Sequence, residues 1–207
     1  MVGFNRRYSS LSVKAKALFG KKTSPLVMLY RVNAGYIPAD HWTQDKNVGG
    51  GRIIGEVCHF VDFLQFICGS LPVSVFSESI SGETGKYFGD DNVSLTIKFA
   101  DGSLGTIIYA SCGSPTFSRE KVEVFGEERV LSIDDFKKAT VIRAGKQKSI
   151  KKMSQDMGYG NELDYFVNSK EFDGGELFKG YAAATLTTIR ALQSLQAAVP
   201  VAVDSIL

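Results

Sequence analysis

The chain has 207 residues, of which 44% are hydrophobic and 22% are charged, so it is long enough to bury a core and typical of a globular protein. Its 24 basic and 22 acidic residues give a net charge of +2, which excludes the strongly basic surface of a nucleic-acid-binding protein. No stretch approaches the roughly 20 apolar residues of a membrane span. We expect one domain over residues 1–207, with no nucleic-acid or membrane partner.

The three cysteines, Cys58, Cys68 and Cys112, form no CxxC pair and no spacing that suits zinc. An odd number of unpaired cysteines favours a reducing compartment. The sequence therefore predicts a cytoplasmic protein without a metal site.

The N-terminal region is predicted to contain the end of a strand, a helix and a second strand. Residues 1–4 look like the end of a buried strand and are followed at once by polar residues, so we expect the chain to begin inside a fold. Apolar residues with helical spacing predict a helix over 11–19. Pro25 then introduces a predicted strand over 26–33.

Alternation along this strand places Arg31 and Asn33 on the same face, near the strand end. Such a polar pair indicates either a ligand site or an exposed strand face. Residues 34–48 contain turn formers throughout and predict a long loop that carries the only tryptophan, Trp42. Trp42 is a candidate for stacking on a sugar ring or for a packing anchor.

Apolar residues recur at intervals of three and four over 52–68, which predicts one helix that Gly69 ends. The period then changes to two. Strands are predicted at 73–80, 93–99, 104–110, 119–126, 129–133 and 140–143, the lysine-rich stretch 146–152 is interpreted as a loop, and helices are predicted at 161–168 and 176–198. This order predicts an α+β fold with an open sheet covered by helices on one side.

The stretch GGGRIIGEVCHFVD at 49–62 places three glycines before the predicted helix. A dinucleotide loop needs a hydrophobic strand leading directly into its glycines and a second strand soon after the helix. The preceding residues HWTQDKNV do not form such a strand. We interpret the glycines as allowing close backbone approach at the start of a helix that itself presents chemistry.

His59 lies three residues after Glu56 and three before Asp62, so a carboxylate is one turn away in either direction. A histidine held by a carboxylate is a plausible general base near neutral pH. A partly buried histidine with a structural role fits the same spacing. A metal site would need His41 as a second ligand, and a nucleophilic Cys58 would have to leave the apolar face of the helix.

Several stretches together resemble a known family. They are VGFNRRYSS at 2–10, LYRVNAGYIPADHW at 29–42, GGGRIIGEVCHFVDFLQFICG at 49–69, DDNVSLTIKFADGSLGTIIYAS at 90–111, YGNELDYFV at 159–167 and the final VPVAV. The combination resembles the C-terminal part of the glucose-fructose oxidoreductase, inositol dehydrogenase and rhizopine-catabolism (Gfo/Idh/MocA) family.

The resemblance implies a C-terminal domain of the dihydrodipicolinate-reductase type, with an open, largely antiparallel sheet that shapes the substrate pocket and often forms the oligomer interface. Family members carry an N-terminal Rossmann domain that binds NAD or NADP, and they oxidise or reduce a hydroxyl carbon of a sugar or polyol. By resemblance, His59 is the catalytic histidine. We expect a homo-oligomer assembled through the open sheet.

The sequence departs from the family in two ways. The family usually has an aspartate four residues before the histidine, where this chain has Gly55, so Glu56 is the candidate for the carboxylate. The Glu-Lys-Pro motif and the glycine loop of the Rossmann domain are not in this chain. We therefore expect residues 1–20 to be the crossover from a missing domain, and the chain alone to be inactive and without bound cofactor.

By resemblance, cofactor contacts are expected at Asn5 and Arg6. Candidate substrate contacts are Arg31, Asn33, Trp42 and Tyr159. A non-catalytic sugar-binding or oligomerisation module on the same fold is the alternative, and Gly55 is the feature that favours it.

Overall fold

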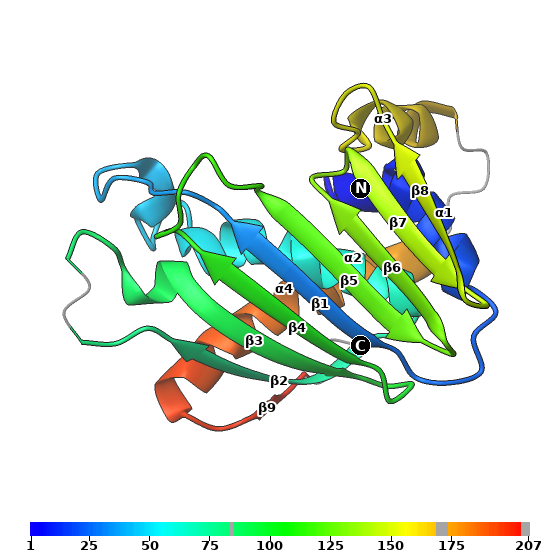
Figure 1. Cartoon of the computed structure of the whole chain (residues 1–207). Coiled ribbons are helices and arrows are strands. Elements are labelled where there is room, and N and C mark those ends of the chain that lie inside the picture. Colours follow the sequence, from blue (N-terminus) through cyan, green and yellow to red (C-terminus); the bar gives the residue numbers. More distant parts are fainter. Residues whose placement is uncertain (83–84, 169–173, 204–207) are drawn as a thin grey trace.

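The computed structural model, which describes residues 1–82, 85–168 and 174–203, is built around one nine-stranded sheet (Figure 1). The strand order is β8-β7-β6-β5-β1-β4-β3-β2-β9, and every pair is antiparallel except β1 with β4. The strands are β1 Val27–Asn33, β2 Pro72–Ser79, β3 Asn92–Phe99, β4 Leu104–Ala110, β5 Glu120–Gly126, β6 Arg129–Asp134, β7 Lys138–Arg143, β8 Lys146–Lys151 and β9 Val201–Ala202.

Helices cover one face of this sheet and none of the described helices lies on the other, uncovered face, which confirms the predicted α+β class (Figure 1). The core lies between them, because alternate strand residues such as Val93, Leu95 and Ile97 turn inward and are fully buried or nearly so. The helices are α1 Ser10–Phe19, α2 Cys58–Cys68, α3 Tyr159–Asn168 and α4 Gly174–Ala197, with 3₁₀ turns at η1 Asn5–Tyr8, η2 Trp42–Gln44 and η4 Gly89–Asp91 and a π-helical turn at η3 Ile53–Val57.

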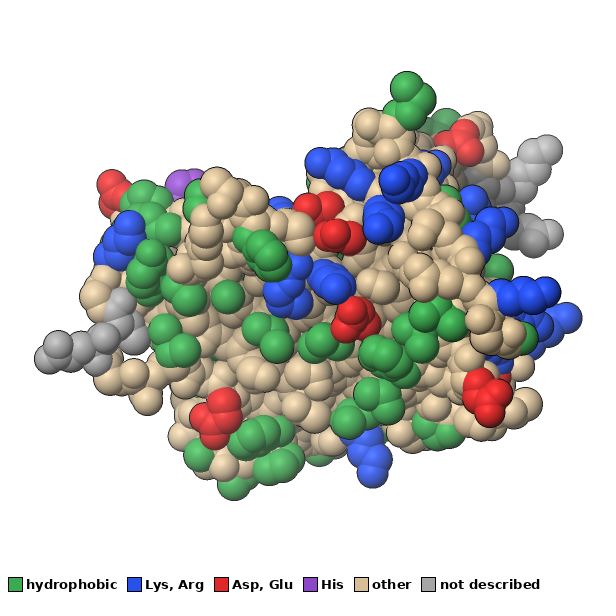
Figure 2. Space-filling view, in the orientation of Figure 1, with side chains coloured by type: hydrophobic (Ala, Val, Ile, Leu, Met, Phe, Trp, Pro, Cys, Tyr) green, Lys and Arg blue, Asp and Glu red, His purple; other side chains and the backbone are tan. Residues whose placement is uncertain are grey.

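The uncovered face of the sheet is turned toward the viewer in Figure 2, where hydrophobic side chains are interspersed with a group of charged ones. Val27, Leu104, Ile108 and Phe125 are among its exposed apolar residues. Exposed apolar side chains of this kind favour association with another surface.

Two predictions about chain segments are wrong. Residues 1–4 form no strand and lead instead into the 3₁₀ turn η1. The lysine-rich stretch predicted as a loop is strand β8, which a tight turn at Ala144 and Gly145, both with positive φ, joins to β7. Lysines suit this position because β8 is an edge strand, where charged side chains discourage pairing with another chain.

The single helix predicted over 52–68 is also divided. The π-helical turn η3 precedes α2, and its wider winding changes the direction in which the following side chains point. Gly69 ends α2 in the left-handed conformation, as predicted.

Candidate active site

The glycine run shapes the backbone just before the π-helical turn. Gly50 and Gly51 have φ of +73° and +80°, in the left-handed region that favours glycine. A Cβ on Gly49 would lie 2.6 Å from the Trp42 carbonyl oxygen. The glycines therefore allow the close backbone approach that the sequence predicted. The segment that leads into them contains the 3₁₀ turn η2 and not the strand that a dinucleotide-binding loop requires.

His59 is half-buried in the first turn of α2, and its ring packs edge-on against Phe4 with 5.3 Å between ring centroids. The Nδ1 atom is buried and has no hydrogen-bond partner among the described residues. Burial lowers the pKa of His59 to about 4; the charge of Arg6 acts in the same direction, and Glu120 and Glu56 partly oppose it. The imidazole is therefore neutral at pH 7.

The two carboxylates expected to hold His59 are directed elsewhere. Asp62 is buried and forms a bidentate ion pair with Arg7, at 2.9 Å from the Arg7 Nε. The Oε2 atom of Glu56 accepts a hydrogen bond of 2.9 Å from the Tyr109 hydroxyl. Glu56 thus acts on His59 through its charge and not through a hydrogen bond to Nδ1.

Glu56 is held in place by three donors from separate parts of the chain. Besides the Tyr109 hydroxyl, the Nη2 atom of Arg52 lies 3.3 Å from Oε1, and the Nη2 atom of Arg119 lies 3.6 Å from Oε2. The Glu56 side chain still keeps 30% of its surface exposed. It is therefore a fixed carboxylate that solvent or a ligand can reach.

A second glutamate on the same side of the sheet is closed off. Glu120 accepts hydrogen bonds of 2.8 and 2.7 Å from Nε and Nη2 of Arg6 and one of 2.5 Å from the Tyr30 hydroxyl, and it is 1% exposed. Burial opposes its charged form, but the hydrogen bonds and charge of Arg6 outweigh burial, so the pKa of Glu120 is lowered. Arg6 also stacks over the ring of Phe60.

The two residues predicted to contact the cofactor are both buried and bonded within the chain. Arg6 is committed to Glu120, and the Asn5 amide donates a hydrogen bond of 2.8 Å to the Met157 carbonyl oxygen. These side chains do not fit direct binding of a dinucleotide as they stand. Cofactor contact at Asn5 and Arg6 stays a prediction.

Arg31 and Asn33 lie on the uncovered face of β1, whereas Tyr30 and Val32 turn toward the helices. Arg31 donates to the Ser118 carbonyl oxygen at 2.6 Å, and Asn33 donates to the Ser114 carbonyl oxygen at 2.7 Å. The predicted shared face is confirmed. The sheet separates this pair from the helix that carries His59, and both side chains anchor the loop before β5.

Trp42 and Tyr159 are each 62% exposed, on η2 and at the start of α3 respectively. Tyr159 is close enough to Arg6 to interact with it electrostatically. Trp42 packs near His41. A substrate role for either residue stays a prediction.

Sequence analysis missed five residues of this network: Tyr30, Arg52, Tyr109, Arg119 and Glu120. One signal could have found Glu120. Alternation along 120–126 places it on the same buried face as Val122 and Val124, where an acidic residue needs a partner.

The described residues contain neither a metal cluster nor a helix that could span a membrane. Within residues 1–82, 85–168 and 174–203, no three His, Cys, Asp or Glu side chains gather closely enough to hold a metal ion. In the same ranges, every helix is too short or too polar to cross a bilayer.

The site combines a neutral imidazole, a fixed carboxylate and a one-sided open sheet in an α+β domain. Residues 26–132 match the GFO/IDH/MocA C-terminal domain, and the chain belongs to this family. Comparison with curated proteins gives no significant match.

The structure is similar to solved oxidoreductases at low identity. An oxidoreductase domain protein from Kribbella flavida superposes with a TM-score of 0.79 and 18% identity, covering 99% of this chain and 66% of that one. A putative myo-inositol dehydrogenase from Sinorhizobium meliloti 1021 superposes with a TM-score of 0.73 and 19% identity, covering 99% of this chain and 65% of that one. Levoglucosan dehydrogenase in complex with NADH and levoglucosan superposes with a TM-score of 0.77 and 16% identity, covering 100% of this chain and 67% of that one. The chain thus spans about two thirds of these proteins.

Proposed function

We propose that this chain is the substrate domain of an NAD- or NADP-dependent oxidoreductase that acts on a hydroxyl carbon of a sugar or polyol. Membership of the family supports the reaction class. Two proteins of similar fold, levoglucosan dehydrogenase and a putative myo-inositol dehydrogenase, support the substrate class. The NADH in the levoglucosan dehydrogenase complex supports the cofactor class.

His59 is the proposed general acid–base, and its half-buried, neutral imidazole is the observation that carries the proposal. A neutral imidazole has one nitrogen free to accept a proton. Because the chain encloses Nδ1, Nε2 is the atom through which His59 would take the proton of a substrate hydroxyl and later return it.

Glu56 is the proposed partner of His59. Its negative charge favours the imidazolium that forms when His59 accepts the proton. Tyr109 and Arg52 hold the carboxylate in one orientation, and because 30% of the side chain stays exposed, it could also accept a hydrogen bond from a substrate hydroxyl.

The cofactor would be held by a dinucleotide-binding domain outside these 207 residues. The bound nicotinamide would accept or supply the hydride. The coverage of about two thirds of the similar structures supports this arrangement, and without that domain the chain would not turn over substrate. The uncovered sheet face, with its exposed apolar residues, is the proposed interface of a cytoplasmic homo-oligomer.

The test compares two histidines in the protein expressed together with its dinucleotide-binding domain. His59→Ala is expected to lower kcat/KM about 10²–10⁴-fold, because a positioned general acid–base contributes that much. His41→Ala, which removes the exposed loop histidine, is the matched control and should retain activity. Levoglucosan and myo-inositol with NAD⁺ or NADP⁺ are the first substrates to test, with nicotinamide absorbance as the readout.

The alternative function is a non-catalytic sugar-binding or oligomerisation module. Gly55 favours it, because a Cβ there would meet only the Gly49 carbonyl oxygen at 3.7 Å, so space does not require a glycine in place of the family's aspartate. Turnover that is unchanged in His59→Ala would remove His59 from the mechanism and favour this alternative.

A further inference from the structure

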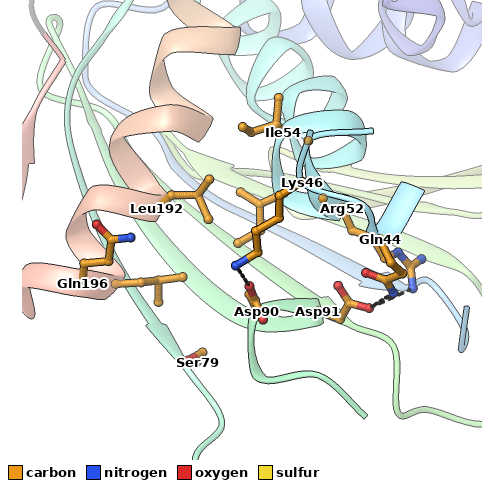
Figure 3. A pocket seen from close by; sticks show the side chains of 13 residues that line it. Gln44, Lys46, Arg52, Ile54, Ser79, Asp90, Asp91, Leu192 and Gln196 are labelled. Carbon is orange, nitrogen blue, oxygen red and sulfur yellow. Dashed lines mark hydrogen bonds and ion pairs between the residues drawn. The ribbon is translucent and has the colours of Figure 1, made fainter. Parts of the chain in front are cut away.

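We propose that a cavity beside the glycine turn is a second ligand site, which binds a neutral, polyhydroxylated ring compound such as a monosaccharide. The cavity measures about 470 Å³, within the range of small-molecule sites. It lies between the loop with η2, the start of η3, the 3₁₀ turn η4 and the last turns of α4 (Figure 3).

Aliphatic side chains line the cavity from two sides. Ile54 comes from η3, and Leu192 comes from α4 on the other side (Figure 3). Leu195 of α4 also lines the cavity. Aliphatic side chains suit the C–H face of a sugar ring, because burying that face lowers the free energy of the complex while the hydroxyls at the edge of the ring remain available for hydrogen bonds. A ligand without an apolar face would place polar groups against these aliphatic side chains.

The charged side chains that line the cavity balance one another. Lys46 Nζ lies 3.5 Å from Asp90, and Arg52 Nη1 lies 3.9 Å from Asp91 (Figure 3). An anion would meet the two aspartates, and a cation would meet Lys46 and Arg52. Hydroxyl groups both donate and accept hydrogen bonds, so a neutral polyol can satisfy both kinds of partner.

Arg52 is a buried cation in the wall of the cavity. The residue is 2% exposed and lines the cavity, and its Nε has no hydrogen-bond partner among the described residues. One of its other nitrogens, Nη1, donates to the Gly35 carbonyl oxygen at 2.7 Å. The side-chain amide of Gln44 already donates to Asp91 at 2.7 Å and to the Ile37 carbonyl oxygen at 3.4 Å, so Gln196 brings the lining amide that can both donate to and accept from a ligand.

This cavity is distinct from the candidate active site. Neither His59 nor Glu56 lines it. Arg52 connects the two places, because its Nη2 contacts Glu56 while its Nη1 faces Asp91. The proposal does not rest on the oxidoreductase proposal, and binding alone tests it without cofactor or turnover.

The experiment is a ¹H–¹⁵N NMR titration of the 207-residue chain with methyl α-D-glucopyranoside, myo-inositol and, separately, inorganic phosphate. We expect the sugar or the cyclitol to shift the backbone amides of Gly50 and Gly51 and the side-chain amides of Gln44 and Gln196, with millimolar affinity. Phosphate should leave these signals in place.

Leu192→Trp is designed to fill the cavity and should weaken binding at least about tenfold, a difference that a titration resolves easily. Ile189→Trp, on the same helix but outside the cavity, is the matched control and should bind normally. If Leu192→Trp loses its dispersed spectrum, Gln196→Ala replaces it and should weaken binding several-fold. The proposal is overturned if neither polyol shifts these amides, if phosphate alone shifts them, or if Leu192→Trp or Gln196→Ala binds as the unmodified chain does.

Discussion

Two glutamates stand near His59, and each is joined to a buried arginine, yet the two ion pairs differ in almost every other respect. Glu120 and Arg6 form a bidentate pair in which the carboxylate is 1% exposed. Glu56 meets Arg52 through one contact of 3.3 Å and keeps 30% of its side chain accessible. Arg119 lies near both carboxylates, at 3.6 Å from Glu56 and 3.8 Å from Glu120.

The difference separates a structural role from a chemical one. Glu120 is the only acidic partner within reach of Arg6 that the described residues provide, so the pair neutralises a charge inside the core. Arg52 has other partners, the Gly35 carbonyl oxygen and Asp91, so Glu56 is less necessary to it. Because the fold depends less on Glu56, its carboxylate can bind a ligand without leaving a buried charge unpaired.

Glutamine in place of either glutamate removes the negative charge, and we expect the larger loss of stability at Glu120. Glu120→Gln leaves the Arg6 guanidinium buried without an anion, and removing one partner of a buried pair costs about 3–5 kcal/mol of unfolding free energy. Urea unfolding followed by circular dichroism measures it. Glu123→Gln, on the same strand but half-exposed, should stay within about 0.5 kcal/mol of the unmodified chain. A loss at Glu120 no larger than at Glu123 would contradict a structural role for the pair.

The pH dependence of stability should show how strongly the site keeps His59 neutral. The pKa of about 4 lies below the ordinary value of 6.5, so protonation favours the unfolded chain. The stability from this difference is fully present above pH 6.5 and is lost as the pH falls through 4, by up to roughly 3 kcal/mol.

Urea midpoints at pH 7, 5.5 and 4 test this for the unmodified chain and for His59→Gln, which cannot titrate. We expect the unmodified chain to lose more stability than His59→Gln over this interval. Parallel pH profiles for the two proteins would show that the folded chain does not depress the pKa of His59.

Glu56→Gln should have a smaller effect, about 1 kcal/mol, because the amide oxygen can still accept from Tyr109 and Arg52 keeps its other partners. The urea measurement used for Glu120→Gln applies here, with both variants at pH 7. A cost equal to that of Glu120→Gln would mean that the two ion pairs serve the same structural purpose.

Lys46→Ala should have the smallest effect, below about 0.5 kcal/mol, since the pair with Asp90 is exposed and exposed pairs contribute little. Thermal unfolding of this variant beside the unmodified chain measures it. A clear destabilisation would show that the Lys46–Asp90 contact holds η4 in place.

Local patterns predicted most of the elements because they depend on near neighbours. Alternation over 93–99 predicted β3, and the helical spacing of α2 together with Gly69 predicted where that helix ends. The pattern failed at β8, where lysines outnumber apolar residues because the strand lies at an edge and buries little. It also missed η3, since a π-helical turn has the same composition as an α-helical one.

The sequence by itself determined the fold class, because periodicity is a local property. The spacing around His59 fitted a structural histidine as well as a general base, and the family resemblance is what favoured catalysis. Only the tertiary structure decided which charged groups surround that histidine and how they are paired with one another. Arg6 and Glu120 are 114 positions apart, and Tyr109 is 53 positions from Glu56, so no spacing rule connects them. Which charges become neutralised, and which stay accessible, depends on the burial that arises when distant segments pack together.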